Sequence, residues 1–159
     1  MSLTGDHRVR RFGGGTPASR AHGTFSPDGR LLAYVSDESG LLQVYVAEVD
    51  APASRWQVTS DGGDLPMWRP DGKELFWVGL DRTLRVAPVQ SLTPFAVGAP
   101  APLFRLRLPL LSLTGNHSFY SPSRDGQRFL VRSWVGEESE PGLLVTMSWR
   151  PPAQGDAAR

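Results

Sequence analysis

The stretch that decides the fold is Phe25-Ser26-Pro27-Asp28-Gly29-Arg30-Leu31-Leu32-Ala33-Tyr34-Val35. Its first half has the residues of a tight turn: proline presets the backbone, aspartate hydrogen-bonds nearby backbone, and glycine accepts a positive φ. Its second half, residues 31–35, is apolar at every position, which is typical of a strand covered on both faces. The stretch therefore predicts two antiparallel strands joined by a turn.

This pattern occurs three times in the chain. The second copy is Trp68-Arg69-Pro70-Asp71-Gly72-Lys73-Glu74-Leu75-Phe76-Trp77-Val78, and the third is Pro122-Ser123-Arg124-Asp125-Gly126-Gln127-Arg128-Phe129-Leu130-Val131. Because Arg124 replaces the proline of the other copies, we expect the third turn to be less rigid. The predicted structural turn residues of the repeat are Pro27, Asp28, Gly29, Pro70, Asp71, Gly72, Asp125 and Gly126.

Each copy is followed by further segments with the composition of strands. Third strands are expected at 42–49, 83–89 and 143–149, and outer strands at 55–59 and 102–106. A meander or sandwich of short strands could share this turn chemistry, but four antiparallel strands recurring roughly every 40 to 55 residues are typical of β-propeller blades. We predict an all-β fold without helix: a β-propeller fragment of about three four-stranded antiparallel blades, the C-terminal part of a six- or seven-bladed propeller.

The repeat also divides the chain into blades. Residues 1–20 are assigned to the outer strand of a preceding blade (4–12) and a linker, 21–60 to the first blade, 61–114 to the second, 115–150 to the third, and 151–159 to a flexible tail. The third blade is expected to lack an outer strand, which residues 9–12 could supply in cis or in trans. Because blades cover one another's faces, we expect self-association or completion of the ring by another chain.

The composition is that of a turn-rich globular domain. The 159 residues are 40% hydrophobic and include 17 glycines and 14 prolines. A formal charge of +1 gives no reason to expect a nucleic-acid partner or an anionic membrane surface. With no cysteine, disulfides and thiolate metal sites are excluded. We see no signal peptide and no transmembrane segment, and we expect no membrane insertion by this chain.

No residue pattern in the sequence indicates catalysis. No Gly-x-Ser-x-Gly elbow is present, and the spacings of His7, His22 and His117 are unrelated, so we interpret these histidines as surface or turn residues. Asp61-Gly62-Gly63-Asp64 has too few ligands for a calcium loop. The prediction is that the chain is not an enzyme and has no catalytic residue, cofactor or metal.

Two other residue sets have a structural interpretation that we favour over a functional one. The Asp-Gly aspartates could form a ring of carboxylates that binds a cation, but turn formation explains each of them. Tryptophans could form a sugar-stacking platform, but strand positions favour a place in the core. These tryptophans are Trp56, Trp68, Trp77, Trp134 and Trp149.

Several longer segments resemble the TolB-type (WD-repeat-like) β-propeller repeat, and the resemblance covers about residues 3–149. They also look like the C-terminal propeller of bacterial receptor-type serine/threonine protein kinases, although the kinase motifs themselves are absent. These segments include 22–29, 36–40, 56–63, 66–68, 71–77 and 125–130.

The resemblance implies a non-catalytic binding or sensor module for a protein or ligand, within a larger bacterial signalling protein. An alternative is an accessory propeller that gates or delivers substrate to a peptidase or kinase domain on another chain. If the chain is part of a receptor-type kinase, the resemblance implies an extracytoplasmic (periplasmic) location. Otherwise we expect a cytoplasmic location.

Overall fold

A computed structural model describes residues 12, 19–107, 119–134 and 141–146 of the chain. These residues form only antiparallel strands, turns and loops, so the predicted all-β fold without helix is confirmed for them. Within those ranges no helix is long and apolar enough to cross a membrane. The strands are β1 (Arg20–Phe25), β2 (Leu31–Ser36), β3 (Gln43–Glu48), β4 (Arg55–Gln57), β5 (Asp64–Trp68), β6 (Glu74–Val78), β7 (Thr83–Leu92), β8 (Phe95–Val97), β9 (Ala101–Arg105), β10 (Tyr120–Pro122), β11 (Phe129–Trp134) and β12 (Pro141–Thr146).

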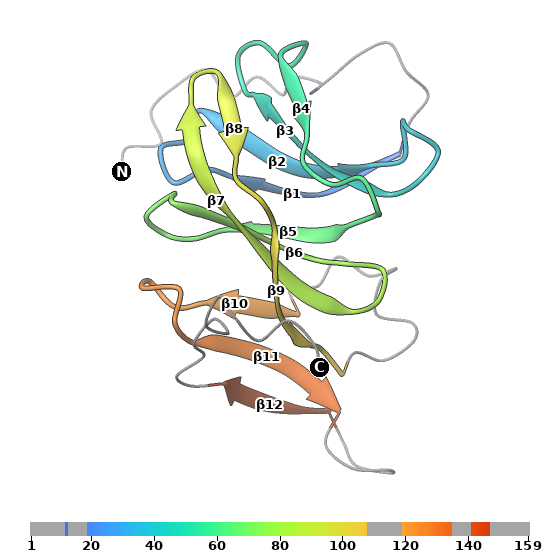
Figure 1. The fold of residues 1–159 in the computed structure, drawn as a ribbon, viewed down its shortest axis with the longest axis vertical. Helices are drawn as coiled ribbons and strands as arrows, with labels where there is room; N and C mark the ends of the chain where they lie inside the picture. Colours follow the sequence, from blue (N-terminus) through green and yellow to red (C-terminus); the bar gives the residue numbers. More distant parts are fainter. Residues whose placement is uncertain (1–11, 13–18, 108–118, 135–140, 147–159) are drawn as a thin grey trace, which may run out of the picture.

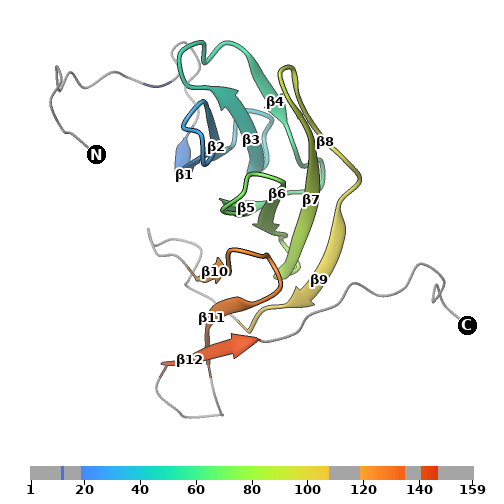
Figure 2. The ribbon, with the colours of Figure 1, turned by 90° about the vertical axis from the view of Figure 1, so that its left-hand side faces the viewer.

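The strands form three sheets that follow one another along the chain. The first sheet has the order β1-β2-β3-β4, the second starts β5-β6-β7, and the third is β10-β11-β12 (Figure 1). In each sheet the first strand is at one edge and later strands follow outward. Seen from the side, β1, β5 and β10 lie at one side of the molecule and β4, β8 and β9 at the other (Figure 2). This is the arrangement of propeller blades around an axis beside β1, β5 and β10.

The second sheet has its outer edge in two pieces. The first half of β7 pairs with β9, from Thr83 opposite Arg105 to Val86 opposite Ala101. After Leu92 the chain reverses direction, and the second half of β7 pairs with β8. The sequence predicted β7 only as far as Val89 and did not predict β8, so this β7–β8 hairpin is the main addition of the structure to the predicted strands.

The three Asp-Gly turns have the same hydrogen bonds. In each turn the glycine N–H donates to the carbonyl three residues earlier, at 2.8 to 2.9 Å, and the glycines have φ between 69° and 76°. One carboxylate oxygen of each aspartate accepts the N–H two residues later, at 3.0 to 3.1 Å. The third turn closes in this way although it lacks the proline. In Figure 1 the three turns lie one above another at the left.

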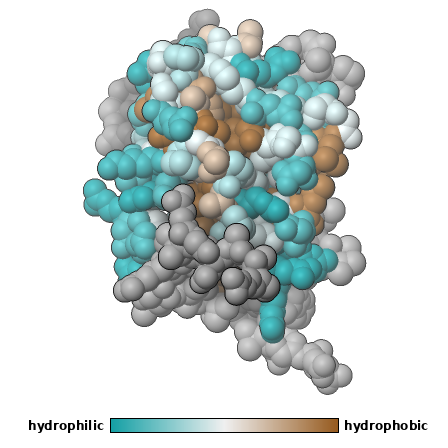
Figure 3. Space-filling view, viewed as in Figure 1, coloured by the Kyte–Doolittle hydropathy of each residue, from teal (hydrophilic) through white to brown (hydrophobic). Residues whose placement is uncertain are grey.

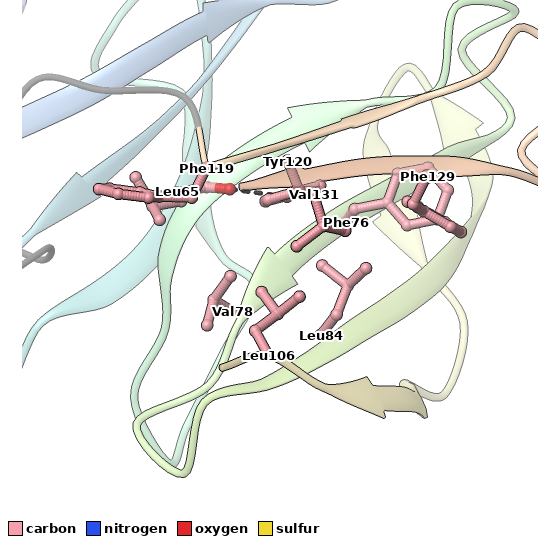
Figure 4. Packing of buried hydrophobic residues seen from close by; sticks show 9 residues of the cluster. All are labelled: Leu65, Phe76, Val78, Leu84, Leu106, Phe119, Tyr120, Phe129 and Val131. Carbon is pink, nitrogen blue, oxygen red and sulfur yellow. Dashed lines mark hydrogen bonds between the residues drawn. The ribbon is translucent and has the colours of Figure 1, made fainter. Parts of the chain in front are cut away.

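The hydrophobic core is divided between neighbouring sheets. Leu31, Ala33, Val44 and Val46 of the first sheet pack with residues of the second, which include Trp68, Leu75 and Trp77. The opposite face of the second sheet packs against the third through the cluster in Figure 4. The interpretation of the tryptophans as core residues is confirmed for Trp68 and Trp77, and Trp56 is half-buried. Trp149 lies outside the described residues.

Several sequence-based expectations concern the parts of the chain outside the described residues. The proposed strand at 4–12 lies there except for Phe12, whose ring contacts Tyr34 of the first sheet edge-on at 5.6 Å. Phe12 therefore lies beside the first sheet of its own chain, and completion of the third blade by residues 9–12, in cis or in trans, stays a prediction. Within the described residues the third sheet has three strands, β10 to β12. The blade boundaries and the tail at 151–159 stay predictions.

Candidate functional site

The predicted turn aspartates are held by their own turns. The Ser26 hydroxyl donates to Asp28 at 2.6 Å, and Ser123 donates in the same way to Asp125. In the second turn Arg69 takes the place of the serine, and its Nε lies 3.2 Å from Asp71. Among the described residues no three His, Asp or Glu side chains are close enough together to hold a metal ion. The hydrogen bonds and ion pair of these carboxylates thus lie within their own turns.

His22 lies on the innermost strand of the first sheet, where its Nδ1 is 2.6 Å from a carboxylate oxygen of Asp64 on the innermost strand of the second. Asp64 is buried, and the same oxygen accepts the backbone N–H of Leu65 at 2.7 Å. The interpretation of His22 as a surface or turn residue is therefore wrong. His7 and His117 lie outside the described residues.

Two further side chains join innermost strands of neighbouring sheets. The Trp68 indole donates to the carbonyl of Thr24 at 3.2 Å. The Tyr120 hydroxyl donates to the carbonyl of Leu65 at 2.7 Å, the bond that is dashed in Figure 4. Burial, and secondarily the charge of Asp64, raise the pKa of Tyr120 well above its usual value, so that the phenol stays protonated as a donor. Together with the His22–Asp64 pair, these bonds join the three sheets beside the axis.

His22 and Leu65 also share an unusual backbone conformation. Their φ values are 51° and 53°, and the pairing register shifts at both places. Positive φ in residues other than glycine is uncommon and needs support from the surrounding structure. The hydrogen bonds around Asp64 provide that support. The chemistry available in this cluster is that of an oriented imidazole paired with a buried carboxylate.

A separate surface lies at the opposite end of the sheets from the Asp-Gly turns. Leu41 and Leu42, in the β2–β3 hairpin, and Leu80, in the β6–β7 hairpin, have exposed side chains, that of Leu80 to 51%. The carbonyl of Leu42 accepts the N–H of Gly63, and the Leu80 side chain covers the neighbouring Gly62. We call these three residues the leucine patch. Apolar surface gathers there at the right-hand edge of Figure 3.

The leucine patch stands on a buried polar network. The amide oxygen of Gln43 accepts the Thr59 hydroxyl at 2.5 Å and the Gly62 N–H at 3.0 Å, and its nitrogen donates to the carbonyl of Ser60. Gly62 has a φ of 93°, and a Cβ there would lie 2.5 Å from the Leu80 side chain. Glycine is therefore required beneath Leu80. The network fixes the connection between the first two sheets and the position of the patch.

Comparisons with known proteins show the β-propeller fold. One similar solved structure is an oligogalacturonate lyase in complex with manganese (TM-score 0.61, 20% identity, covering 89% of this chain and 39% of that one). A second is a putative TolB from Agrobacterium tumefaciens (TM-score 0.52, 15% identity, 82% and 44%), and a third is the β-propeller domain of Cps50 (Swd1) from Myceliophteria thermophila (0.51, 15%, 82% and 40%). The chain spans about two fifths of the length of these structures. No family model and no curated protein matches it.

These comparisons confirm the predicted fold class and overturn one prediction. The sequence led us to expect that the chain is not an enzyme, yet the oligogalacturonate lyase, an enzyme, has a similar propeller. The expectation failed because the sequence was searched for motifs of particular enzyme classes, whereas a propeller can place catalytic groups from several blades around one axis without a local motif. At 20% identity the likeness shows the fold alone.

Proposed function

We propose that this β-propeller is an interaction module that holds a protein partner through the leucine patch. The observation that carries this proposal is the exposure of three leucines from two hairpins on a rigid base. Apolar side chains exposed together at one end of a molecule are costly to expose to water and are typical of protein–protein contact sites. Propeller neighbours support a role in protein interaction in general.

Within this role, the proposed setting is a larger bacterial signalling protein of the receptor-kinase type, with a periplasmic location in that case and a cytoplasmic one otherwise. The support for it is the resemblance of the repeat segments described above. The second candidate is an accessory propeller that serves a peptidase or kinase domain on another chain. The two differ in the partner: the second requires a catalytic domain on a separate polypeptide at the patch.

Photo-crosslinking in the native cells tests the proposal. We expect p-benzoylphenylalanine in place of Leu80 to capture one defined protein, which mass spectrometry identifies, and Leu42→Ser in the same chain to lower the yield several-fold. The matched control carries the probe in place of Gln127, an exposed residue of the third Asp-Gly turn at the other end of the sheets. Equal capture from both positions, or none from position 80, would overturn the role of the patch. Capture of a peptidase or kinase domain would favour the accessory role.

A further inference from the structure

Two adjacent hollows open at the end of the sheets that carries the Asp-Gly turns, away from the leucine patch. The first, of about 380 Å³, lies between the first two turns and the end of β7, and its lining includes Pro27, Gly72, Val89 and Leu92. The second, of about 300 Å³, lies beside the first turn and the end of β3. Asp28 and Leu92 line both hollows, so the two form one groove. We call it the turn-end groove.

The β7–β8 hairpin makes one wall of this groove. Phe95 anchors the hairpin, because its buried ring lies 5.8 Å from that of Trp56 and 5.9 Å from that of Trp68. With the hairpin held in this way, Leu92 projects an exposed side chain at the junction of the two hollows. The first hollow therefore offers an apolar side chain a surface made by Pro27, Val89 and Leu92.

The second hollow is acidic. Asp28, Glu48 and Asp50 line it, with Arg30 as the opposing charge. Within the described residues neither Glu48 nor Asp50 forms an ion pair. In the part of the chain that the structure describes, no three His, Asp or Glu side chains are placed to hold a metal ion, and these carboxylates are no exception. A guanidinium suits them, because it presents five N–H donors in a plane and its aliphatic stem can lie along Leu92.

We propose that the turn-end groove binds an extended segment of a protein partner in which an arginine stands next to an apolar residue. The apolar side chain occupies the hollow against Pro27 and Val89, and the arginine reaches the carboxylates of Glu48 and Asp50. Leu92 separates the two positions. This surface lies at the other end of the molecule from the leucine patch, so the inference is independent of the function proposed for the patch.

An NMR titration of the full 159-residue chain tests the inference with acetyl-Leu-Arg-amide as the probe. We expect saturable shifts of the amides of residues 28–31, 48–50 and 89–92 at millimolar probe, and several-fold weaker binding of acetyl-Leu-Gln-amide. Raising the salt concentration should weaken binding of the arginine probe, since its contacts with exposed carboxylates are screened. Equal binding of the two probes, or shifts centred elsewhere, would overturn the inference, as would the absence of a saturable shift.

A charge-removing variant makes the test specific to the second hollow. Combined Glu48→Gln and Asp50→Asn should reduce affinity for the arginine probe to that for the glutamine probe while leaving the remaining amide spectrum unchanged. Leu80→Ser, in the leucine patch, is the matched control and should bind the arginine probe as the parent chain does. If the double variant binds the arginine probe with unchanged affinity, the carboxylates are not the site.

Discussion

At the scale of single residues, the Asp-Gly turns show how one side chain organises a backbone. The Ser26 hydroxyl, and after it the backbone N–H of Arg30, lower the pKa of the Asp28 carboxyl. Ser123 and the N–H of Gln127 act in the same way on Asp125. A carboxyl with a lowered pKa stabilises the fold above its unfolded-state pKa, and that stabilisation is lost as the pH falls through the folded-state pKa.

Replacement of the serine should therefore change the titration of its aspartate. We expect Ser26→Ala to raise the pKa of Asp28 toward its ordinary value and to cost about 2 kcal/mol at neutral pH, because the Ser26 hydroxyl donates to Asp28 and also accepts the buried N–H of Leu31 at 2.9 Å. The part of the cost that comes from Asp28 should shrink in acid, where the parent chain loses the same contribution. A carbon-13 NMR titration of the aspartate carboxyls measures the pKa. Asp71, whose turn has Arg69 in place of the serine, is the internal control, and an unchanged pKa of Asp28 would contradict the account.

At the scale of strands and hairpins, the sequence predicted what is local. The turns were predictable because their glycines and aspartates form hydrogen bonds with residues at most three positions away. The strands were predictable because an apolar run of this length indicates a strand that is covered on both faces. The β7–β8 hairpin was not, because residues 93–94 contain no glycine signal and the partners of Phe95 lie on other strands. The His22–Asp64 pair and the two surface sites were missed for a similar reason. They form only when separate sheets come together.

The anchoring role of Phe95 can be measured. Phe95→Ala removes a buried ring between two tryptophans and should lower the free energy of unfolding by about 3–5 kcal/mol. Because such a loss could unfold the chain, Phe95→Leu is the companion variant, with a loss of about 1 kcal/mol. Urea unfolding followed by tryptophan fluorescence gives both values. Gln90→Ala, at an exposed position of β7, should stay within about 0.5 kcal/mol of the parent. A similar loss in all three variants would rule out a specific anchor.

At the scale of the whole molecule, equivalent positions of the repeat differ in exposure. Trp68 packs against the first sheet and is 5% exposed, whereas Phe25, its equivalent one repeat earlier, is 60% exposed. The last sheet shows the converse. Phe76 packs against the third sheet and is 1% exposed, whereas Leu130, its equivalent one repeat later, is 44% exposed. Each of these two exposed side chains belongs to a face that is covered in a neighbouring repeat. The face around Phe25 repeats one half of an interface between sheets, and the face around Leu130 repeats the other half.

Such complementary faces should bring two copies of the chain together, since a contact between Phe25 of one and Leu130 of the other reproduces the interface inside each chain. We expect multi-angle light scattering to show a mass that rises with concentration above the 17.4 kDa of the monomer. Phe25→Ser should return the mass toward that of the monomer at concentrations where the parent chain associates. Leu92→Ser, an equal change outside these faces, should not. A folded parent chain that stays monomeric and binds no anilinonaphthalene dye would show that the two faces need no partner.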